Sequence, residues 1–122
     1  ASGFMMTQVT AVALLNEAKV LAHPASIDNV PTDGGKEDHV SMGMTAATKL
    51  RTIVENAEHV LAIELLAAAE GLEYRAPLKP GRGVRRAYEA VRQTAVRLTR
   101  DRSLSEDIQR LALALSRGGF DL

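Results

Sequence analysis

The residues of this chain that are best suited to chemistry lie together in a polar segment between positions 23 and 43. Its sequence is HPASIDNVPTDGGKEDHVSMG, in which Lys36, Glu37, Asp38 and His39 are consecutive. A carboxylate can bind a substrate cation, accept a hydrogen bond or take up a proton, and an imidazole can transfer protons near neutral pH. The prolines and paired glycines of the segment indicate fixed turns. We therefore predict a loop that presents these groups.

The same residues also have an interpretation that involves no chemistry. A helix is expected to begin shortly after Glu37 and Asp38, and acidic residues near a helix N-terminus stabilise its partial positive charge. From composition alone this structural role is favoured. His23 and His39 lack H-x-x-x-H spacing, and the chain has no Cys to supply a thiolate. We expect no metal-ligating residues, and the paired glycines lack the flanking pattern of a phosphate-binding loop.

Helical periodicity is found on both sides of the loop, which we place at residues 23–40. Apolar residues recur at helical spacing over about residues 4–21 and again over about residues 41–70. The second of these helices would be roughly 45 Å long at about 1.5 Å per residue. Compact domains rarely carry a loop of this length without a use for it.

Two shorter helices are expected to follow the long one. Apolar residues recur over about residues 84–100, after a connection that contains several Pro and Gly residues. Ser103 and Glu106 have the S-x-x-E spacing of a capping box, which predicts the start of a fourth helix, and Gly118-Gly119 predicts its end. We predict that residues 1–122 form a single all-α segment of four helices, including one long central helix.

The composition limits the classes of partner. The chain has 122 residues, 46% of them hydrophobic and 3% aromatic, and its formal net charge is zero, so nothing global attracts it to nucleic acid or to an anionic membrane. Polar residues interrupt its apolar N-terminal run, unlike a signal peptide or a membrane span, and a cytoplasmic location is expected. Seven arginines between positions 82 and 102 are the one candidate surface for a polyanion. We expect a solvated or salt-bridging face there instead.

The second half of the long helix is apolar on nearly every side. Residues 61–69 have the sequence LAIELLAAA, a pattern typical of a helix surrounded by other helices. Three companions from the same chain are too few to surround it. We expect the chain to associate with other chains or to be part of a larger helical bundle.

Five segments of the chain resemble one known family. The loop motif HPAS-ID-N-VPT followed by EDHVSMG resembles a signature of the histidine ammonia-lyases, which belong to the aromatic amino acid ammonia-lyases. Four more segments resemble the helices around that signature: SGFMMTQVTAVALLNEAKVLAHPAS, VENAEHVLAIELLAAAEGLEYR, GRGVRRAYEAVR and DRSLSEDIQRL. The resemblance covers essentially the whole chain. It implies that residues 1–122 are the C-terminal portion of a longer enzyme with a helical-bundle fold.

The resemblance implies a reaction and an assembly. Family members are implied to be homotetramers that eliminate ammonia from L-histidine, a step of histidine catabolism, to give trans-urocanate. Their electrophile is a methylidene-imidazolone group derived from an internal Ala-Ser-Gly. Ala1-Ser2-Gly3 has this composition, but it precedes a segment that lies far downstream of the electrophile in the family. We therefore expect the electrophile outside this chain and no activity from the chain alone.

One catalytic residue is carried over from the resemblance. The glutamate of the family's loop falls on Glu37, and its implied role is to hydrogen-bond the substrate and assist proton transfer. The family usually has Gln where this chain has Lys36, whose ammonium is expected to draw Glu37 into a salt bridge. The alternatives are a related tyrosine or phenylalanine ammonia-lyase or aminomutase, a helical oligomerisation module without catalysis, and a nucleic-acid binder that uses the arginine-rich helix.

Overall fold

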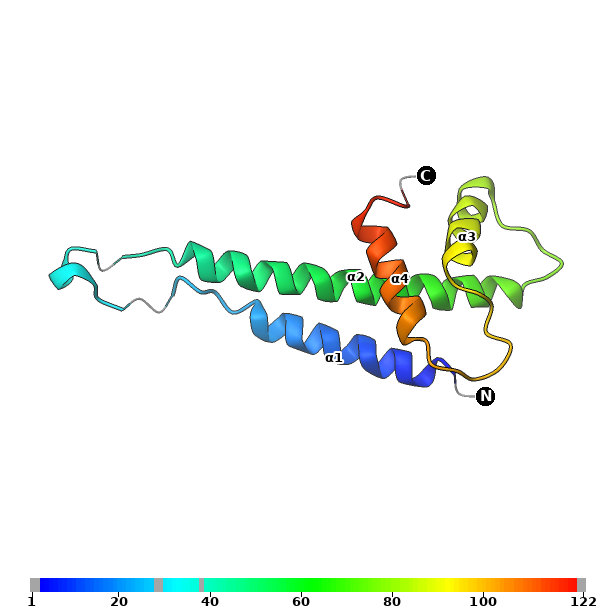
Figure 1. The fold of residues 1–122 in the computed structure, drawn as a ribbon, viewed down its shortest axis with the longest axis horizontal. Coiled ribbons are helices and arrows are strands. Elements are labelled where there is room, and N and C mark those ends of the chain that lie inside the picture. Colours follow the sequence, from blue (N-terminus) through cyan, green and yellow to red (C-terminus); the bar gives the residue numbers. More distant parts are fainter. Residues whose placement is uncertain (1–2, 28–29, 38, 121–122) are drawn as a thin grey trace.

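The computed structural model describes residues 3–27, 30–37 and 39–120, and every regular element within them is helical (Figure 1). The elements in chain order are α1 (Met5–Leu21), a single 3-10 turn η1 (Asp33–Gly35), α2 (Gly43–Glu73), α3 (Arg82–Thr94) and α4 (Ser105–Ser116). The prediction of four helices with one long central helix is confirmed.

An antiparallel hairpin of α1 and α2 forms the long axis of the molecule, with the loop that joins them at one end (Figure 1). With 31 residues, α2 is about 46 Å long at 1.5 Å per residue. Polar contacts between described residues cross the hairpin, two of them from side chains of α2. The Lys49 ammonium donates to the carbonyl oxygen of His23, just beyond the end of α1. Further along, the side-chain amide of Asn56 donates to Glu17 Oε2 at 2.8 Å.

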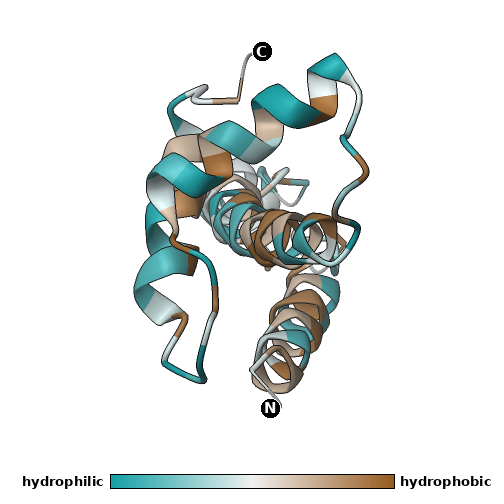
Figure 2. Cartoon of the chain, turned by 90° about the vertical axis from the view of Figure 1, so that its right-hand side faces the viewer, coloured by the Kyte–Doolittle hydropathy of each residue, from teal (hydrophilic) through white to brown (hydrophobic). Residues whose placement is uncertain are grey.

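The hydrophobic core lies at the other end of the hairpin, where α3 and α4 pack on the second half of α2. Viewed along its axis, α2 lies between α1 on one side and α3 and α4 on the other (Figure 2). Small side chains of α2, above all Ala62 and Ala69, are buried and allow the crossing helices a close approach. The other buried apolar residues are Ile63, Leu66, Val91, Ala95, Leu104, Ile108, Leu111 and Ala112.

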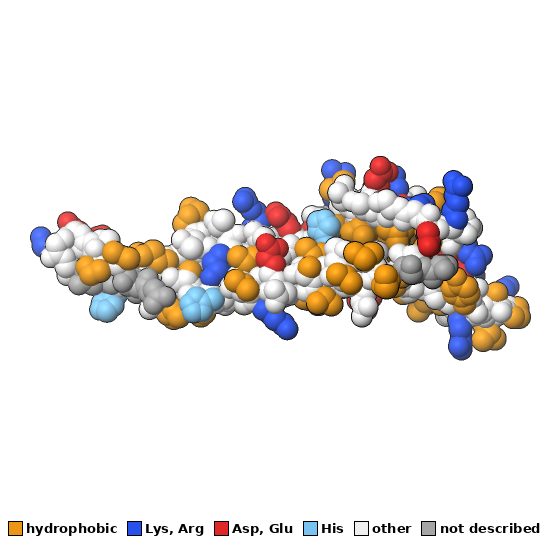
Figure 3. Space-filling model, turned by 90° about the horizontal axis from the view of Figure 1, so that it is seen from below, with side chains coloured by type: hydrophobic (Ala, Val, Ile, Leu, Met, Phe, Trp, Pro, Cys, Tyr) orange, Lys and Arg blue, Asp and Glu red, His pale blue; other side chains and the backbone are white. Residues whose placement is uncertain are grey.

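The hairpin itself leaves much of its apolar surface uncovered. Within α1, Thr7 is the one buried residue among those described. Large hydrophobic side chains remain exposed on α1 and on the outer side of α2, and Figure 3 shows such side chains along the length of the hairpin. They include Met5, Met6, Val9, Val12, Leu15, Val20, Met44, Leu50, Val54 and Leu61. The three companion helices therefore do not surround α2.

The end of the fourth helix is as predicted, but its start is not. Gly118 has φ of +73°, and the amides of Gly118 and Gly119 donate to the carbonyls of Leu115 and Ala114 at 3.0 and 2.8 Å, which is the Schellman arrangement. The capping box was a wrong prediction. Leu104 is the N-cap of α4 and no side chain caps this end. Ser103 Oγ accepts only from the amide of Ser105, at 3.4 Å.

The third helix ends earlier than predicted. The sequence pattern extends to about residue 100, whereas α3 ends at Thr94 and Ala95 has extended backbone angles. Leaving the helix frees the amide of Leu98 to donate to Glu70 Oε2 of α2, at 3.3 Å. A tertiary hydrogen bond to a buried carboxylate here replaces the last turn of the helix.

No helix in the described ranges combines the length and the apolar character that crossing a membrane requires.

We predict that the purified 122-residue chain self-associates through the exposed face of the hairpin, because uncovered apolar side chains gain free energy on burial. Analytical ultracentrifugation at high micromolar concentration should find species heavier than the monomer. Leu61→Gln, on α2, should weaken this association more than the control Leu113→Gln on α4. The two residues are 47% and 50% exposed. A compact monomer that binds no hydrophobic dye would contradict the prediction.

Candidate active-site loop

The loop between α1 and α2 contains a left-handed turn. Asp33, Gly34 and Gly35 have φ values of 47°, 62° and 83°. Side chains with a Cβ atom rarely adopt this backbone conformation, whereas glycine adopts it without strain and aspartate tolerates it better than most residues. The paired glycines are therefore explained by the shape of the turn, as the sequence predicted.

Hydrogen bonds close the loop around this turn. The hydroxyl of Thr32 donates to the carbonyl oxygen of Glu37 at 2.8 Å. In the opposite direction, the amides of Gly35 and Glu37 donate to the carbonyl oxygen of Thr32 at 3.0 and 3.5 Å. The backbone on both sides of Glu37 is thus defined by local contacts rather than by packing.

The carboxylate of Glu37 is exposed and makes no ion pair or hydrogen bond with another described residue. Its predicted role at a helix start is wrong: α2 begins at Gly43, and its first turn contains no acidic residue. The expected salt bridge with Lys36 is also not formed among the described residues. Asp38, the other acidic candidate, lies outside them. Glu37 is consequently a carboxylate without a structural partner among the residues that the structure describes.

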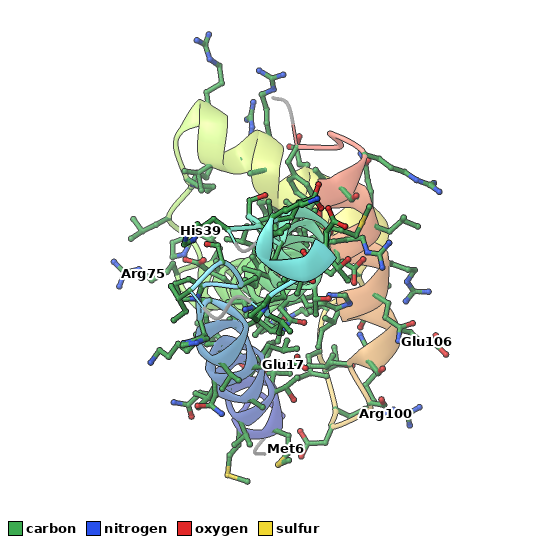
Figure 4. The ribbon with its side chains drawn as sticks, turned by 90° about the vertical axis from the view of Figure 1, so that its left-hand side faces the viewer. Met6, Glu17, His39, Arg75, Arg100 and Glu106 are labelled. Carbon is green, nitrogen blue, oxygen red and sulfur yellow. The ribbon has the colours of Figure 1, made fainter. Side chains whose placement is uncertain are left out.

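The two loop histidines do not form a metal centre with the other described residues. His23 and His39 are both exposed, and no group of three potential ligands is found in the described ranges. Figure 4 looks along the hairpin from the loop end, where His39 is labelled. His23 contributes through its backbone, since its carbonyl oxygen accepts the hydrogen bond from Lys49.

The arginine-rich segment is largely occupied by ion pairs. Arg92 reaches Glu70 at 2.8 Å and Glu73 at 3.1 Å, and Arg97 lies 3.5 Å from Glu70, whose side chain is only 7% exposed. The Arg92 guanidinium also stacks 5.5 Å from the centre of the Tyr88 ring. Four of the seven arginines pair with acidic residues, namely Arg85, Arg92, Arg97 and Arg102. This arrangement favours the salt-bridging interpretation over nucleic-acid binding.

A cavity of about 730 Å³ lies at the other end of the hairpin from the loop, between α1, α2 and α4. Its walls include Leu14, His59 and Ile108. His59 Nδ1 is 2.7 Å from the carbonyl oxygen of Glu55 in its own helix. Sequence patterns gave no signal for this cavity, because three helices and the connection before α4 contribute to it.

Gly3 is the described residue of the Ala-Ser-Gly triplet, and it does not lie beside Glu37. Ala1 and Ser2 lie outside the described residues. Gly3 precedes α1 and lies at the end of the hairpin opposite the loop (Figure 1). A Cβ atom on Gly3 would be 2.6 Å from Leu98 Cδ2, so its backbone packs directly against the connection between α3 and α4. The described part of the triplet is packed structure, remote from the candidate loop.

The fold and the loop together define a helical-bundle protein that presents a carboxylate at the tip of an interhelical hairpin. The family model for the aromatic amino acid lyases matches residues 1–93, and the chain belongs to this family. The histidine ammonia-lyase of Anaeromyxobacter sp. strain K is 51% identical over 99% of this chain and 24% of its own length. The histidine ammonia-lyase of Koribacter versatilis is 54% identical over 97% of this chain and 23% of its own length. The chain thus spans about a quarter of these curated relatives.

Solved structures match the fold over nearly the whole chain. The crystal structure of histidine ammonia-lyase from Trypanosoma cruzi superposes with a TM-score of 0.93 and 39% identity, covering 98% of this chain and 24% of that one. The crystal structure of tyrosine aminomutase from Streptomyces globisporus superposes with a TM-score of 0.86 and 39% identity. The match covers 98% of this chain and 23% of the aminomutase chain. The four-helix arrangement therefore corresponds to a portion of larger lyase and aminomutase chains.

We predict that Tyr88→Phe destabilises the chain near neutral pH by about 1 kcal/mol, the usual value of one hydrogen bond. The Tyr88 hydroxyl donates to Glu73, and this bond, followed by hydrogen bonding and attraction from Arg92, outweighs burial and lowers the pKa of Glu73 from 4.5. A lowered pKa of a carboxyl group stabilises the fold at pH values above the ordinary pKa of that group. The stability is lost as the pH falls through the lowered pKa.

The measurement is chemical denaturation at neutral pH and at an acidic pH below the lowered pKa of Glu73, where this carboxyl group is protonated in both the folded and the unfolded state. The difference between wild type and Tyr88→Phe should shrink at the acidic pH. Tyr74→Phe is the matched control, because Tyr74 is 76% exposed. An equal loss of stability at both pH values would show that the Glu73 charge is not involved.

Proposed function

We propose that this chain is the C-terminal portion of a histidine ammonia-lyase, which eliminates ammonia from L-histidine to give trans-urocanate. The carbon–nitrogen bond at Cα breaks, a proton leaves Cβ, and a double bond forms between the two carbons. The observation that carries the proposal is the exposed carboxylate of Glu37 on a closed loop, which has no partner among the described residues. Identity of about 50% to curated histidine ammonia-lyases over nearly the whole chain supports it.

Glu37 is the residue of this chain that we assign to the reaction. Its carboxylate would accept a hydrogen bond from the imidazole or amino group of the substrate and would hold or transfer a proton there. Because the carboxylate has no ion-pair partner among the described residues, it is free to bind a positively charged or N–H-bearing substrate. None of the other described residues is assigned to substrate binding.

The electrophile and the remaining binding groups would come from outside this chain. The methylidene-imidazolone group supplies the electrophilic centre that activates the substrate for loss of ammonia. The position of Gly3 at the opposite end of the hairpin from Glu37 supports an origin for that group elsewhere in the polypeptide.

An aminomutase or ammonia-lyase acting on tyrosine is the second candidate. The tyrosine aminomutase structure is as similar in sequence, at 39%, as the histidine ammonia-lyase structure, but its TM-score is lower. An ionised carboxylate at position 37 can accept a hydrogen bond from an imidazole N–H and from a phenol O–H alike, whereas the curated relatives that are about 50% identical over nearly the whole chain are histidine ammonia-lyases. We therefore place histidine first, and comparing turnover of histidine and tyrosine by one full-length enzyme separates the two.

The exposed apolar surface of the hairpin supports an assembly of several chains. We assign this surface to contacts within a homotetramer, in which hairpins from several subunits form a central helical bundle. The enzyme would act in the cytoplasm, in the breakdown of histidine.

We predict that the isolated chain has no ammonia-lyase activity, because one carboxylate cannot replace the electrophile. Purified chain and histidine should give no increase in the ultraviolet absorbance of urocanate, while a full-length histidine ammonia-lyase assayed in parallel should give one. Urocanate formed by the chain alone would overturn the assignment of the electrophile to another segment.

We predict that Glu37→Gln in a full-length lyase carrying this segment lowers kcat by about 10²–10⁴-fold, the usual contribution of a general acid–base group. Thermal unfolding should be nearly unchanged, because the carboxylate has no partner among the described residues. The control is Glu106→Gln, since Glu106 is an exposed glutamate of α4 (Figure 4). Normal turnover combined with lowered stability would return Glu37 to a structural role.

A further inference from the structure

Thr32 and Glu37 are joined by hydrogen bonds in both directions. The side chain of Thr32 donates to the carbonyl oxygen of Glu37 at 2.8 Å, and the amide of Glu37 donates to the carbonyl oxygen of Thr32 at 3.5 Å. We call these two contacts the Thr32–Glu37 pair. The contact at 3.5 Å is at the outer limit for an N–H···O bond, so the hydroxyl makes the stronger of the two.

The turn enclosed by this pair is not one that the chain adopts easily. Three successive residues with positive φ separate Thr32 from Lys36, and Asp33 is one of them. The left-handed conformation costs an L-residue with a Cβ atom free energy that glycine avoids. A further bond, from the amide of Lys36 to the carbonyl oxygen of Asp33, is long at 3.3 Å. The hydroxyl bond of Thr32 is therefore the shortest contact that keeps the turn closed.

Among the described residues, no other hydrogen bond reaches the backbone of Glu37. Thr32 and Glu37 are both exposed, as are the described residues between them, and the core lies at the other end of the hairpin. The Lys49 contact fixes the base of the loop at His23. This contact does not reach the tip of the loop, where the hydrogen bonds are local. One of them runs from the Thr32 hydroxyl to Glu37 itself.

We propose that Thr32 is a positioning residue, whose hydroxyl holds Glu37 in the place from which its carboxylate acts. The inference rests on the proposed function of Glu37. A proton-transfer group must lie within hydrogen-bonding distance of its target, and a shift of about 1 Å can cost up to about 10²-fold in rate. Thr32 would not contact the substrate, and it would act only through the backbone of Glu37.

The test uses a full-length lyase carrying this segment and begins with the steady-state kinetics of three single variants. Thr32→Val keeps the shape of the side chain but removes the hydroxyl, and kcat should fall roughly tenfold, as expected for one lost hydrogen bond, with KM changed less than about twofold. Thr32→Ser restores the hydroxyl and should restore kcat. Thr48→Val should leave kcat unchanged, because the exposed Thr48 hydroxyl donates to Met44 within α2, at 2.9 Å.

A double variant shows whether Thr32 acts through Glu37. In the Glu37→Gln background, Thr32→Val should lower kcat by less than about twofold, because there is no catalytic carboxylate left to misplace. A full tenfold loss in that background, or normal kcat in Thr32→Val alone, would overturn the inference. A normal kcat in Glu37→Gln alone would instead overturn the proposed function, so the two failures are distinguishable.

Discussion

Close packing of α3 and α4 on the second half of α2 is the constraint on which the rest of the structure depends. Small buried residues such as Ala62 and Ala69 bring the crossing helices near enough for Leu111 to be fully enclosed. The buried carboxylate of Glu70 then holds Arg92 and the amide of Leu98 against α2. All the buried apolar residues of the described ranges lie in this half of the molecule, and the hairpin extends away from it.

This division separates a packed core at one end of the molecule from an exposed loop at the other. The loop carrying Glu37 lies far from the core, and its conformation depends on a left-handed turn and a few hydrogen bonds. The same hairpin presents uncovered apolar side chains along much of its length. A segment of this kind suits an enzyme in which several parts of the polypeptide meet at one active site, because each part can bring its residue without enclosing the site alone.

Sequence patterns predicted the parts of the fold that depend on local chemistry. The apolar period located all four helices, the prolines and glycines located the loop, and Gly118-Gly119 located the end of α4. The failures came from contacts between distant residues. The end of α3 is set by Glu70, 28 positions before Leu98, and α4 begins with no side-chain cap. In the site, Glu37 was found from the loop motif, but its separation from the start of α2 and its pairing with Thr32 depend on left-handed backbone that the sequence did not reveal.

The central claim is that Glu37 belongs to an active site completed by other segments. The most direct test is the crystal structure of a full-length lyase carrying this segment, with a non-reactive histidine analogue bound. Our account predicts a Glu37 carboxylate oxygen within hydrogen-bonding distance, about 2.6–3.2 Å, of an imidazole or amino nitrogen of the analogue. A Glu37 side chain turned away from the bound analogue, or paired with a lysine or arginine of another segment, would contradict it.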